Sequence, residues 1–325
     1  MRLLKALIIG IGGQDGFYLS DFLLQKENYQ VHGVDRTEAL PFELKRKLAG
    51  IDFVDLEKPG QIGKIVERVR PDEIYFLAAH HFSSQGDENR TGSLMPFIRI
   101  NLAPVDEVLQ VLVGGLKESR FFYAASSHVF GIPADTPQTE LTPQRPETPY
   151  AISKSSALHA CRYYRETYGL YASVGIMYNH ESIRRGMAFL TKQIAHAAAL
   201  ACSGKPQKIY IRDLDAVVDW GAAEDYVRAM WLTLQQPCGD EYIIATGAPH
   251  TVRDFAQTAF SWVGLDPKDF VVQDSKSAAL RRYPPYIGDP SKIKKICGWA
   301  PGISFEDLVR NMVNDEIKIL RSQNM

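Results

Sequence analysis

Residues 4–16 read LKALIIGIGGQDG, an apolar run that leads directly into a glycine-rich turn. The run predicts a buried first strand. Gly10, Gly13 and Gly16 fit a turn that holds a dinucleotide: one glycine makes the turn, one admits the pyrophosphate, and one lets helix and strand pack closely. Gln14 and Asp15 lie in the same turn, where the next helix presents its positive end. The stretch predicts the first unit of a Rossmann-type fold; an ordinary strand–helix turn is the alternative.

The rest of the first half alternates strands and helices. Strands are expected at residues 29–35, 52–55, 73–79, 120–126 and 172–178, and helices at residues 17–25, 62–69, 102–116 and 150–168. This alternation predicts an α/β protein with a doubly wound parallel sheet. After Asn179 come helices, short strands and proline-rich loops, ending in a helix over residues 305–319. We predict a dinucleotide-binding domain (residues 1–178) and a smaller, mainly substrate-binding lobe (residues 179–325), interleaved in one compact unit.

Composition narrows the class of protein further. The 325 residues carry a formal net charge of -1, which gives no reason to expect nucleic acid or an anionic membrane as a partner. The four cysteines are scattered, so the sequence indicates neither zinc nor a disulfide framework. The short N-terminal apolar run is interrupted by Lys5 and leads into the glycine turn, unlike a signal peptide. No apolar stretch is long enough to span a bilayer, and a reducing cytoplasm is the expected location.

Asp35 ends the second expected strand, about twenty residues after the glycine turn. A carboxylate there accepts hydrogen bonds from the ribose hydroxyls and repels a 2′-phosphate, which favours NAD. Arg36 follows directly and favours NADP instead, because guanidinium binds phosphate well. The sequence therefore favours NAD as cofactor, with NADP as the alternative.

Two further segments are expected to line the cofactor. Asp55 and Leu56, after the third strand, are placed to contact the adenine. Leu77, Ala78 and Ala79 end the fourth strand, where small residues let a cofactor pass. Plain core packing is the competing interpretation, above all for Leu56 and Leu77.

Tyr150 and Lys154 are four residues apart, so they share one side of the expected helix over residues 150–168. A free tyrosine has a pKa of about 10, but a neighbouring ammonium and an oxidised nicotinamide ring both favour its phenolate. The pair predicts a hydride-transfer enzyme in which Tyr150 acts as base. A solvated helix pair is the alternative, since this spacing is common by chance.

Several segments resemble one family. Residues 179–186 read NHESIRRG, which closely resembles NHESPRRG of the GDP-mannose 4,6-dehydratases. Residues 10–16 are similar to that family's glycine turn. Later motifs of the family are matched by residues 214–216, 219–221, 225–231, 288–290 and 298–299. The resemblance therefore spans nearly the whole chain. The broader group is the extended short-chain dehydrogenase/reductases that act on nucleotide sugars.

The resemblance implies a reaction that oxidises the sugar at C4, removes the C5 proton, releases water from C6 and returns the hydride to C6. It implies that Tyr150 is the base for the C4 hydroxyl and that Lys154 holds the nicotinamide ribose. Ser126 stands where the family has the hydroxyl that bonds the C4 oxygen, and the neighbouring Ser127 is expected at the substrate.

The NHESIRRG segment supplies further implied contacts. His180 and Arg185 match positions that contact the cofactor, and Asn179 lies where the sugar diphosphate is held. Because the segment directly follows the sixth expected strand, these side chains are expected at the ligand edge of the sheet.

The largest departure from the family is His128. Residues 125–131 read ASSHVFG and resemble STSELYG of the dehydratases, whose glutamate removes the C5 proton and protonates the leaving hydroxyl. Histidine can act as acid and base near neutral pH, so His128 is expected to take that role. The alternative is that His128 only fills the pocket or bonds the substrate.

His80 and His81 also differ from the family, which has Gln or Met and then Ser. With His128 they suggest a metal cluster, but no carboxylate or cysteine spacing supports one, and adjacent residues on a strand point apart. We therefore expect no metal, and expect His81 to contact the nicotinamide or the sugar.

Three substrate positions differ as well: Ile183 replaces a proline, Val218 an arginine and Gln193 a lysine. Losing two cations weakens the case for identical contacts to the diphosphate or guanine. The remaining cations expected to bind the substrate are Lys192, Arg281 and Arg282.

Three functions follow from these residues. The first is a GDP-hexose 4,6-dehydratase-like lyase that uses His128. The second keeps only the redox step, as a nucleotide-sugar 4-dehydrogenase, 4-epimerase or 4-keto reductase. The third is a cofactor-binding relative without turnover, which the intact Ser126, Tyr150 and Lys154 disfavour. The resemblance also implies a homodimer or homotetramer, and a place in surface polysaccharide or deoxysugar synthesis.

Overall fold

The computed structural model describes residues 2–38, 40–81, 93–273 and 285–323. A seven-stranded sheet forms its centre, in the order β10-β6-β5-β4-β1-β2-β3, and all its neighbouring strands are parallel. Its strands are β1 (Leu4–Ile9), β2 (Tyr29–Asp35), β3 (Gly50–Phe53), β4 (Glu73–Phe76), β5 (Arg120–Ala124), β6 (Ala172–Met177) and β10 (Glu241–Ile244). The predicted doubly wound α/β fold is confirmed.

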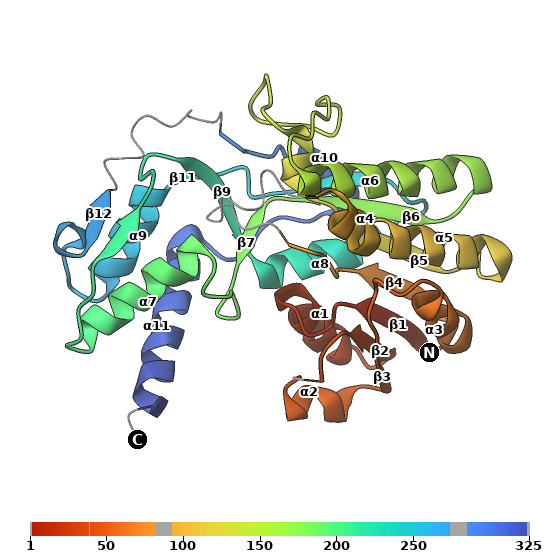
Figure 1. Cartoon of the computed structure of the whole chain (residues 1–325), viewed down its shortest axis with the longest axis horizontal. Helices are drawn as coiled ribbons and strands as arrows, with labels where there is room; N and C mark the ends of the chain where they lie inside the picture. Colours follow the sequence, from red (N-terminus) through yellow and green to blue (C-terminus); the bar gives the residue numbers. More distant parts are fainter. Residues whose placement is uncertain (1, 39, 82–92, 274–284, 324–325) are drawn as a thin grey trace.

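Helices cover both faces of the sheet (Figure 1). One face carries α1 (Gln14–Leu24), α2 (Phe42–Lys47), α8 (Ala223–Thr233) and α10 (Ser291–Cys297). The other carries α3 (Gln61–Val69), α5 (Ala103–Gly115) and α6 (Pro149–Tyr168), and α4 (Met95–Asn101) runs directly into α5.

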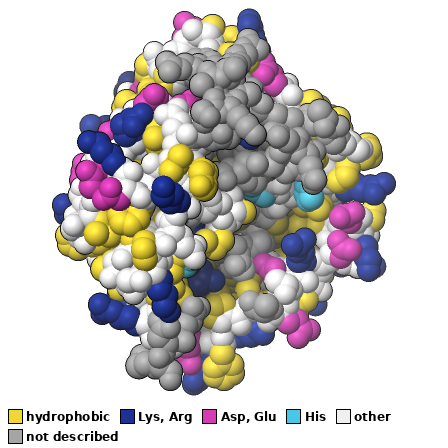
Figure 2. Space-filling model, turned by 60° about the vertical axis from the view of Figure 1, so that its left-hand side comes forward, with side chains coloured by type: hydrophobic (Ala, Val, Ile, Leu, Met, Phe, Trp, Pro, Cys, Tyr) yellow, Lys and Arg dark blue, Asp and Glu magenta, His cyan; other side chains and the backbone are white. Residues whose placement is uncertain are grey.

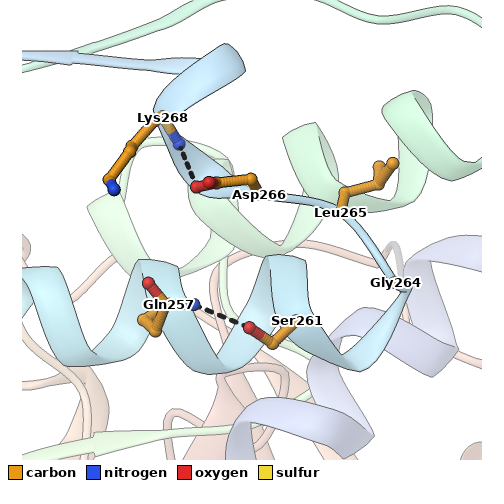
Figure 3. A pocket seen from close by; sticks show the side chains of 6 residues that line it. All are labelled: Gln257, Ser261, Gly264, Leu265, Asp266 and Lys268. Atoms are coloured by element: carbon orange, nitrogen blue, oxygen red, sulfur yellow. Dashed lines mark hydrogen bonds between the residues drawn. The ribbon is translucent and has the colours of Figure 1, made fainter.

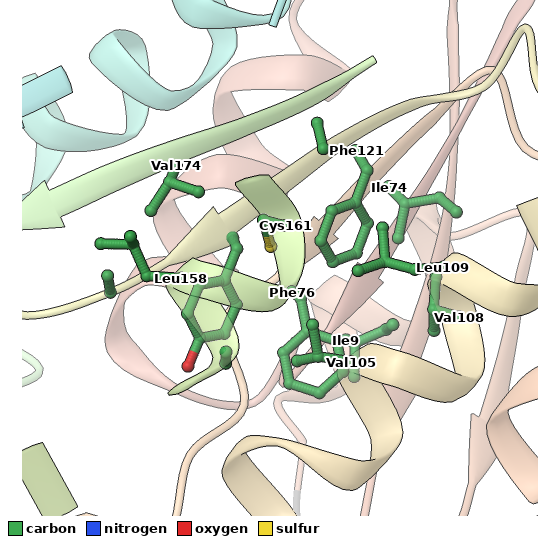
Figure 4. Packing of buried hydrophobic residues seen from close by; sticks show 14 of the residues in the cluster. Ile9, Ile74, Phe76, Val105, Val108, Leu109, Phe121, Leu158, Cys161 and Val174 are labelled. Carbon is green, nitrogen blue, oxygen red and sulfur yellow. The ribbon is translucent and has the colours of Figure 1, made fainter. Parts of the chain in front are cut away.

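The strands are apolar because their side chains pack in a core between the sheet and helices α5 and α6. Figure 4 shows Ile9, Ile74, Phe76 and Phe121 of the strands packed against Val105, Val108, Leu109, Leu158 and Cys161 of the helices. All of these side chains are fully buried. Strands covered on both faces read as continuous apolar runs, as residues 6–9 do. Each such side chain contributes about 1.5–3 kcal/mol when buried, so this core holds the strand ends in fixed positions.

The C-terminal half builds most of a second lobe, which Figure 1 shows beside the sheet. Helices α7 (Leu190–Cys202), α9 (Val252–Trp262) and α11 (Phe305–Gln323) pack together there. A three-stranded sheet, ordered β11 (Pro249–Thr251), β9 (Val217–Ala222) and β7 (Asn179–Glu181), joins them, as does the pair β8 (Ile209–Ile211) and β12 (Val271–Gln273). Two short 3-10 helices are η2 (Ser127–Phe130) and η3 (Pro267–Asp269).

Several elements differ from the sequence-based expectation. Strand β10 was not predicted, and it returns the chain to the main sheet from beyond Asn179. Helix α1 begins at Gln14 rather than Phe17, so Gln14 and Asp15 lie in its first turn. Strand β4 ends three residues early, because the amides of Leu77 and Ala78 both donate to the Ile9 carbonyl and end the ladder there. Within the part of the chain described, no helix is long and apolar enough to cross a membrane.

Candidate active site

The strand order reverses beside β1, which lies between β4 and β2. Chain connections leave in opposite directions at such a point, and a crevice opens at the carboxyl ends of the strands. The glycine turn follows β1 at this crevice, Asp35 ends β2, and Ala78 follows β4. The segments predicted to hold a cofactor therefore meet at one edge of the sheet.

The glycine turn has no room for side chains. Gly10 has a φ of +93°, and a Cβ on it would lie 2.7 Å from the amide nitrogen of Ala78. A Cβ on Gly16 would lie 2.3 Å from the carbonyl oxygen of Gly10. Gly13 is the N-cap of α1 and supplies no side-chain cap, so the first amides of the helix stay open to an anion. These features fit a pyrophosphate at the start of α1.

Asp35 is fixed beside this turn by its backbone neighbours. Its Oδ2 accepts a hydrogen bond from the Gly12 amide at 2.7 Å, and its Oδ1 accepts one from the Arg36 amide at 2.8 Å. Asp35 is half-buried, whereas Arg36 is exposed. The carboxylate thus stands at the end of β2 with a set orientation, as a reader of ribose hydroxyls requires.

The remaining segments predicted to contact the cofactor lie at the same edge. Leu56, Leu77 and Ala78 are half-buried, and Asp55 and Ala79 are exposed. Leu56 and Leu77 also pack against the two cores of the main sheet. Each of these leucines thus has one part in the core and one part accessible, so core packing and cofactor contact are compatible.

Asp15 and His180 join the glycine turn to the NHESIRRG segment. The His180 Nε2 lies 2.9 Å from both carboxylate oxygens of Asp15, and its Nδ1 lies 2.7 Å from the Tyr178 carbonyl oxygen. Burial raises the pKa of Asp15, but its pairing with His180 outweighs burial, so this pKa lies below its usual value. Burial lowers the pKa of His180, and Asp15 outweighs it, so this pKa is raised. Each member of the pair therefore favours the charged form of the other.

Two further contacts strengthen this junction. The Gln14 side chain donates to the His180 carbonyl at 3.0 Å and accepts a hydrogen bond from the Ser182 hydroxyl at 2.7 Å. The His180 ring stacks on Tyr226 at 4.6 Å between centroids. Gln14, Asp15 and His180, predicted from separate motifs, therefore form one connected group.

Tyr150 lies in the first turn of α6 and is buried. Thr148 caps this helix, since its hydroxyl accepts a hydrogen bond from the Ala151 amide at 3.1 Å. Burial raises the pKa of the Tyr150 phenol to about 12, although a hydrogen bond with Ser126 and the positive charge of Arg185 both act to lower it. Ser126, which follows β5, thus reaches the phenol.

Lys154 differs from the expectation for an ammonium that activates Tyr150. Its Nζ donates to the Ala124 carbonyl at 2.7 Å and lies 5.9 Å from the Tyr150 ring centroid. Burial lowers the pKa of Lys154 to about 7. Lys154 is therefore only partly charged at neutral pH, and the cation that opposes burial at Tyr150 is Arg185.

The two adjacent histidines point to different neighbours. The His80 ring packs edge-to-face on Phe97 at 4.6 Å, whereas the His81 ring lies 5.7 Å from Tyr150 and 5.0 Å from Phe189. Partial burial, and then the positive charges of Arg185 and other neighbours, lower the pKa of His81 to about 4. His81 is therefore a neutral imidazole beside the phenol at physiological pH.

His128 lies on η2, directly after β5. Its ring packs against Tyr150 at 6.0 Å with an interplanar angle of 79°. The Ser126 hydroxyl caps η2 by accepting a hydrogen bond from the His128 amide at 3.3 Å. Ser127, between them, is buried. Ser126, His128 and Tyr150 are therefore brought together, with Lys154 one helical turn away.

Arg185 is held by a buried carboxylate that the sequence did not single out. Its guanidinium forms two hydrogen bonds to Glu181, at 2.7 and 3.1 Å, and stacks on the Phe189 ring at 3.9 Å. Glu181 also accepts a hydrogen bond from the Thr191 hydroxyl at 2.8 Å. The Glu–Arg pair was present in the quoted motif, but no spacing rule distinguishes it from its neighbours.

The predicted substrate residues are placed less uniformly. Asn179 is exposed at the start of β7. Lys192 is buried, pairs with Glu316 of α11 and donates to the Ile183 carbonyl at 2.9 Å. Arg281 and Arg282 lie outside the described residues. Among the described members of this set, Asn179 belongs to the NHESIRRG segment, and Lys192 contacts that segment through the Ile183 carbonyl.

The three substrate positions that differ from the family are Ile183, Gln193 and Val218. Ile183 is exposed, and the Gln193 side chain donates to the Met187 carbonyl at 2.9 Å. Val218 pairs with Tyr286 in an isolated β-bridge.

Asn101 is a further site residue that sequence reasoning missed. It is fully buried at the end of α4. Its side-chain oxygen accepts a hydrogen bond from the His80 amide at 2.7 Å, and its nitrogen donates to the His80 carbonyl at 3.2 Å and the Ser153 hydroxyl at 2.9 Å. Asn101 thus ties the chain after β4 to α6, which carries Tyr150. A lone asparagine in an apolar helix gives no sequence signal for this role.

Outside this site, the described part of the chain has a surface of mixed charge (Figure 2) and a shallow hollow in the second lobe. Figure 2 shows Lys and Arg interspersed with Asp and Glu on the face it presents, with histidines near its middle. A hollow in the second lobe is lined by Gln257, Ser261, Gly264, Leu265, Asp266 and Lys268 (Figure 3). It is a shallow depression between α9 and η3. Among the described residues, no group of three or more His, Cys, Asp or Glu side chains is arranged to hold a metal ion.

Comparison with known proteins places the chain. The model of the family described as GDP-mannose 4,6 dehydratase matches residues 7–312. GDP-mannose 4,6 dehydratase 1 of Arabidopsis thaliana is 36% identical, over 98% of this chain and 91% of the relative. GDP-mannose 4,6-dehydratase of Vibrio cholerae is 34% identical, over 97% of this chain and 94% of the relative.

Solved structures share the fold at lower identity. UDP-glucose 4-epimerase of Thermotoga maritima, solved with UDP-glucose, has a TM-score of 0.84 at 22% identity, covering 98% of this chain and 100% of that one. dTDP-glucose 4,6-dehydratase of Bacillus anthracis, solved with NAD, has a TM-score of 0.80 at 20% identity, covering 97% of each chain. The chain therefore belongs to the GDP-mannose 4,6-dehydratase family, within the NAD(P)-dependent enzymes that modify nucleotide sugars.

Proposed function

We propose that the protein removes water from a GDP-hexose, with GDP-mannose as the first candidate, by oxidation at C4 and elimination across C5 and C6. One observation carries the proposal: the imidazole of His128 packs against the phenol of Tyr150, at 6.0 Å between ring centroids. Two groups able to move protons are thus adjacent, as proton transfers at neighbouring sugar carbons require. Membership of the dehydratase family supports the choice of substrate.

The residues of the crevice fit NAD(P). The glycine turn excludes side chains where a pyrophosphate would approach, and α1 offers its open amides there. Asp35 would hold the adenosine ribose, and Lys154 the nicotinamide ribose. The chemistry that NAD(P) supplies when bound is reversible uptake of a hydride.

Tyr150 takes the proton of the C4 hydroxyl in this proposal while the hydride leaves C4, which gives a 4-keto sugar. Ser126 bonds the same oxygen. The phenol has a pKa of about 12 within the protein, so its activation relies on positive charge beside it. Arg185, fixed by Glu181, supplies part of that charge.

His128 carries out the elimination. Its neutral imidazole removes the proton from C5, a C5–C6 double bond forms, and the C6–O bond breaks. The imidazolium gives its proton to the leaving hydroxyl, which departs as water. With NAD(P) bound, the hydride would return to C6, and a proton from solvent would add at C5. One imidazole can serve both proton transfers because histidine titrates near neutral pH.

The remaining assignments complete the proposal. Residues 1–178 mainly bind the dinucleotide and residues 179–325 mainly bind the substrate, with Asn179 at the sugar diphosphate. Ser127, Lys192, Arg281 and Arg282 are proposed to contact or support the substrate. We further propose a homodimer or homotetramer that works in the cytoplasm, with nucleic acid and membranes not among its partners.

The proposed reaction is tested by mass spectrometry of GDP-mannose incubated with the purified protein and NAD(P). We expect a product lighter by one water and no net change in cofactor absorbance, because the hydride is returned. A mass change of two hydrogens without loss of water, together with a change in cofactor absorbance, would instead identify a 4-dehydrogenase or 4-keto reductase. Neither change, together with an altered sugar stereochemistry, would identify a 4-epimerase.

Asp35→Ala is expected to raise the preference for NADP over NAD, measured as the ratio of kcat/KM values, by about tenfold or more. The substitution removes the negative charge that repels the 2′-phosphate of NADP and the acceptor for two hydrogen bonds from the ribose of NAD. Each factor of ten in this preference corresponds to about 1.4 kcal/mol. Asp35→Asn is the matched control for folding, because it keeps an acceptor for the Gly12 amide. Unchanged selectivity in both variants would show that Asp35 does not read the ribose.

A further inference from the structure

The His128 imidazole contacts two phenol rings. Tyr150 packs against it at 6.0 Å, and Tyr286 at 5.7 Å with an interplanar angle of 39°. Tyr286 follows α9 and β12 in the chain, so it reaches His128 from the second half of the protein. The His128 ring therefore contacts one aromatic ring from α6 and one from the segment before α10.

Tyr286 also holds the other end of the turn that carries His128. Its hydroxyl donates a hydrogen bond to the carbonyl of Gly131, the residue that ends η2. Gly131 has a φ of +61°, and a Cβ on it would lie 1.8 Å from the Arg145 carbonyl oxygen. The Gly131 amide donates back to the His128 carbonyl at 3.1 Å. One tyrosine therefore contacts the imidazole with its ring and the end of the same turn with its hydroxyl.

The segment that carries Tyr286 is held by hydrogen bonds to Gln138, which is fully buried. The Gln138 side-chain oxygen accepts hydrogen bonds from the Ile287 amide at 3.1 Å and from the Tyr178 hydroxyl at 2.8 Å. The Gln138 backbone bonds the residues on both sides of Gly288, since its amide donates to the Ile287 carbonyl and its carbonyl accepts from the Asp289 amide, both at 2.8 Å. The segment that carries Tyr286 thus has few ways to move relative to η2.

We propose that Tyr286 is the positioning residue that fixes the His128 imidazole for elimination of water, an inference that rests on the proposed function. A histidine on a four-residue turn can rotate about two side-chain bonds, and contact with two aromatic rings restricts that rotation. Elimination needs the imidazole within hydrogen-bond reach of both the C5 proton and the C6 hydroxyl. In this proposal Tyr286 contacts neither the C5 proton nor the C6 hydroxyl of the sugar and acts only through His128.

The test compares Tyr286→Leu, which removes the ring, with Tyr286→Phe, which removes only the hydroxyl. GDP-mannose is the substrate, and two rates are measured: C4 oxidation in a single turnover, from cofactor absorbance, and water loss, from product mass. For Tyr286→Leu we expect water loss to fall about 10- to 100-fold, as for a misplaced catalytic group, with KM and C4 oxidation within about threefold of wild type. Reduced cofactor should then accumulate during turnover. Tyr286→Phe should retain most of the activity.

Two controls separate positioning from a general effect. Tyr210→Leu removes a tyrosine that is 69% exposed in the second lobe and should leave both rates unchanged. In a His128→Ala background, Tyr286→Leu should cause no additional loss, because residues that act through one group are not additive. If Tyr286→Leu does not fold, Tyr286→Met fills the space with a flexible apolar side chain and tests the same point.

Equal loss of both rates in Tyr286→Leu, normal water loss, or an additional loss in the His128→Ala background would each overturn the inference. A wild-type protein that oxidises C4 but releases no water from GDP-mannose would overturn the proposed function, and the inference with it. A wild-type protein that releases water while Tyr286→Leu does so equally well would overturn the inference alone.

Discussion

The Tyr150→Phe variant is expected to lose C4 oxidation, with kcat lowered about 100- to 10,000-fold, while cofactor binding stays within about threefold of wild type. The substitution removes a single oxygen from a buried side chain whose ring packs against His81, Phe97 and His128. The ring contacts survive, so the loss reports on the proton that the phenol moves. The measurement is the single-turnover absorbance of reduced cofactor with GDP-mannose.

Tyr164→Phe is the matched control, because Tyr164 lies on the same helix and its hydroxyl donates to Asp106 at 2.8 Å. It also loses one hydroxyl, but on the part of α6 away from the crevice. We expect near-normal turnover and a melting temperature close to that of Tyr150→Phe. Near-normal turnover of Tyr150→Phe itself would remove Tyr150 from the mechanism.

The electrostatics around Tyr150 explain why the phenol needs help from its surroundings. Burial raises its pKa to about 12, and the positive charge that acts to lower this pKa is that of Arg185 rather than Lys154. Burial also lowers the pKa of Lys154 to about 7, because desolvation disfavours its charged ammonium as it disfavours the Tyr150 phenolate. The helical spacing of Tyr150 and Lys154 was predicted correctly, but spacing carries no information about how dry the site is.

The glycine turn could be predicted from the sequence because its constraints are local. Gly10 and Gly16 collide with backbone atoms of the same turn or the adjacent strand end if they carry side chains. The positive φ of Gly10 and the clash at Gly16 arise within the turn itself, so they leave a pattern in the sequence. The first strand was predicted with correct ends for the same reason.

Strand β10 and the contacts of Lys192 could not be predicted, because long-range packing decides them. Strand β10 is only four residues long and begins with Glu241, and so short a segment does not distinguish a sheet strand from a loop. Successive residues on a helix point about 100° apart, so the phase of α7 decides which of Lys192 and Gln193 turns inward. Lys192 turns toward Glu316, more than 100 residues away in the chain. The surroundings of His128 likewise depend on Tyr286, which no local pattern connects to it.

His128→Ala is expected to separate the two halves of the reaction. C4 oxidation should continue, since Ser126 and Tyr150 remain, whereas water loss should fall about 100- to 10,000-fold, as for removal of a general acid–base group. Oxidised sugar and reduced cofactor should accumulate, so absorbance should rise and persist where the wild type shows no net change. Mass spectrometry should find a sugar that has lost two hydrogens but no water.

His128→Glu gives the sharpest comparison, because it restores the residue that the resembling dehydratases carry. A carboxylate can also remove and deliver protons, but it lacks the aromatic ring through which His128 contacts Tyr150 and Tyr286. We therefore expect partial recovery of water loss relative to His128→Ala. His159→Ala, which removes an exposed histidine from α6, should behave as wild type. If His128→Ala still releases water at the wild-type rate, the acid–base group lies elsewhere, and His81, whose neutral imidazole also packs against Tyr150, becomes the residue to replace next.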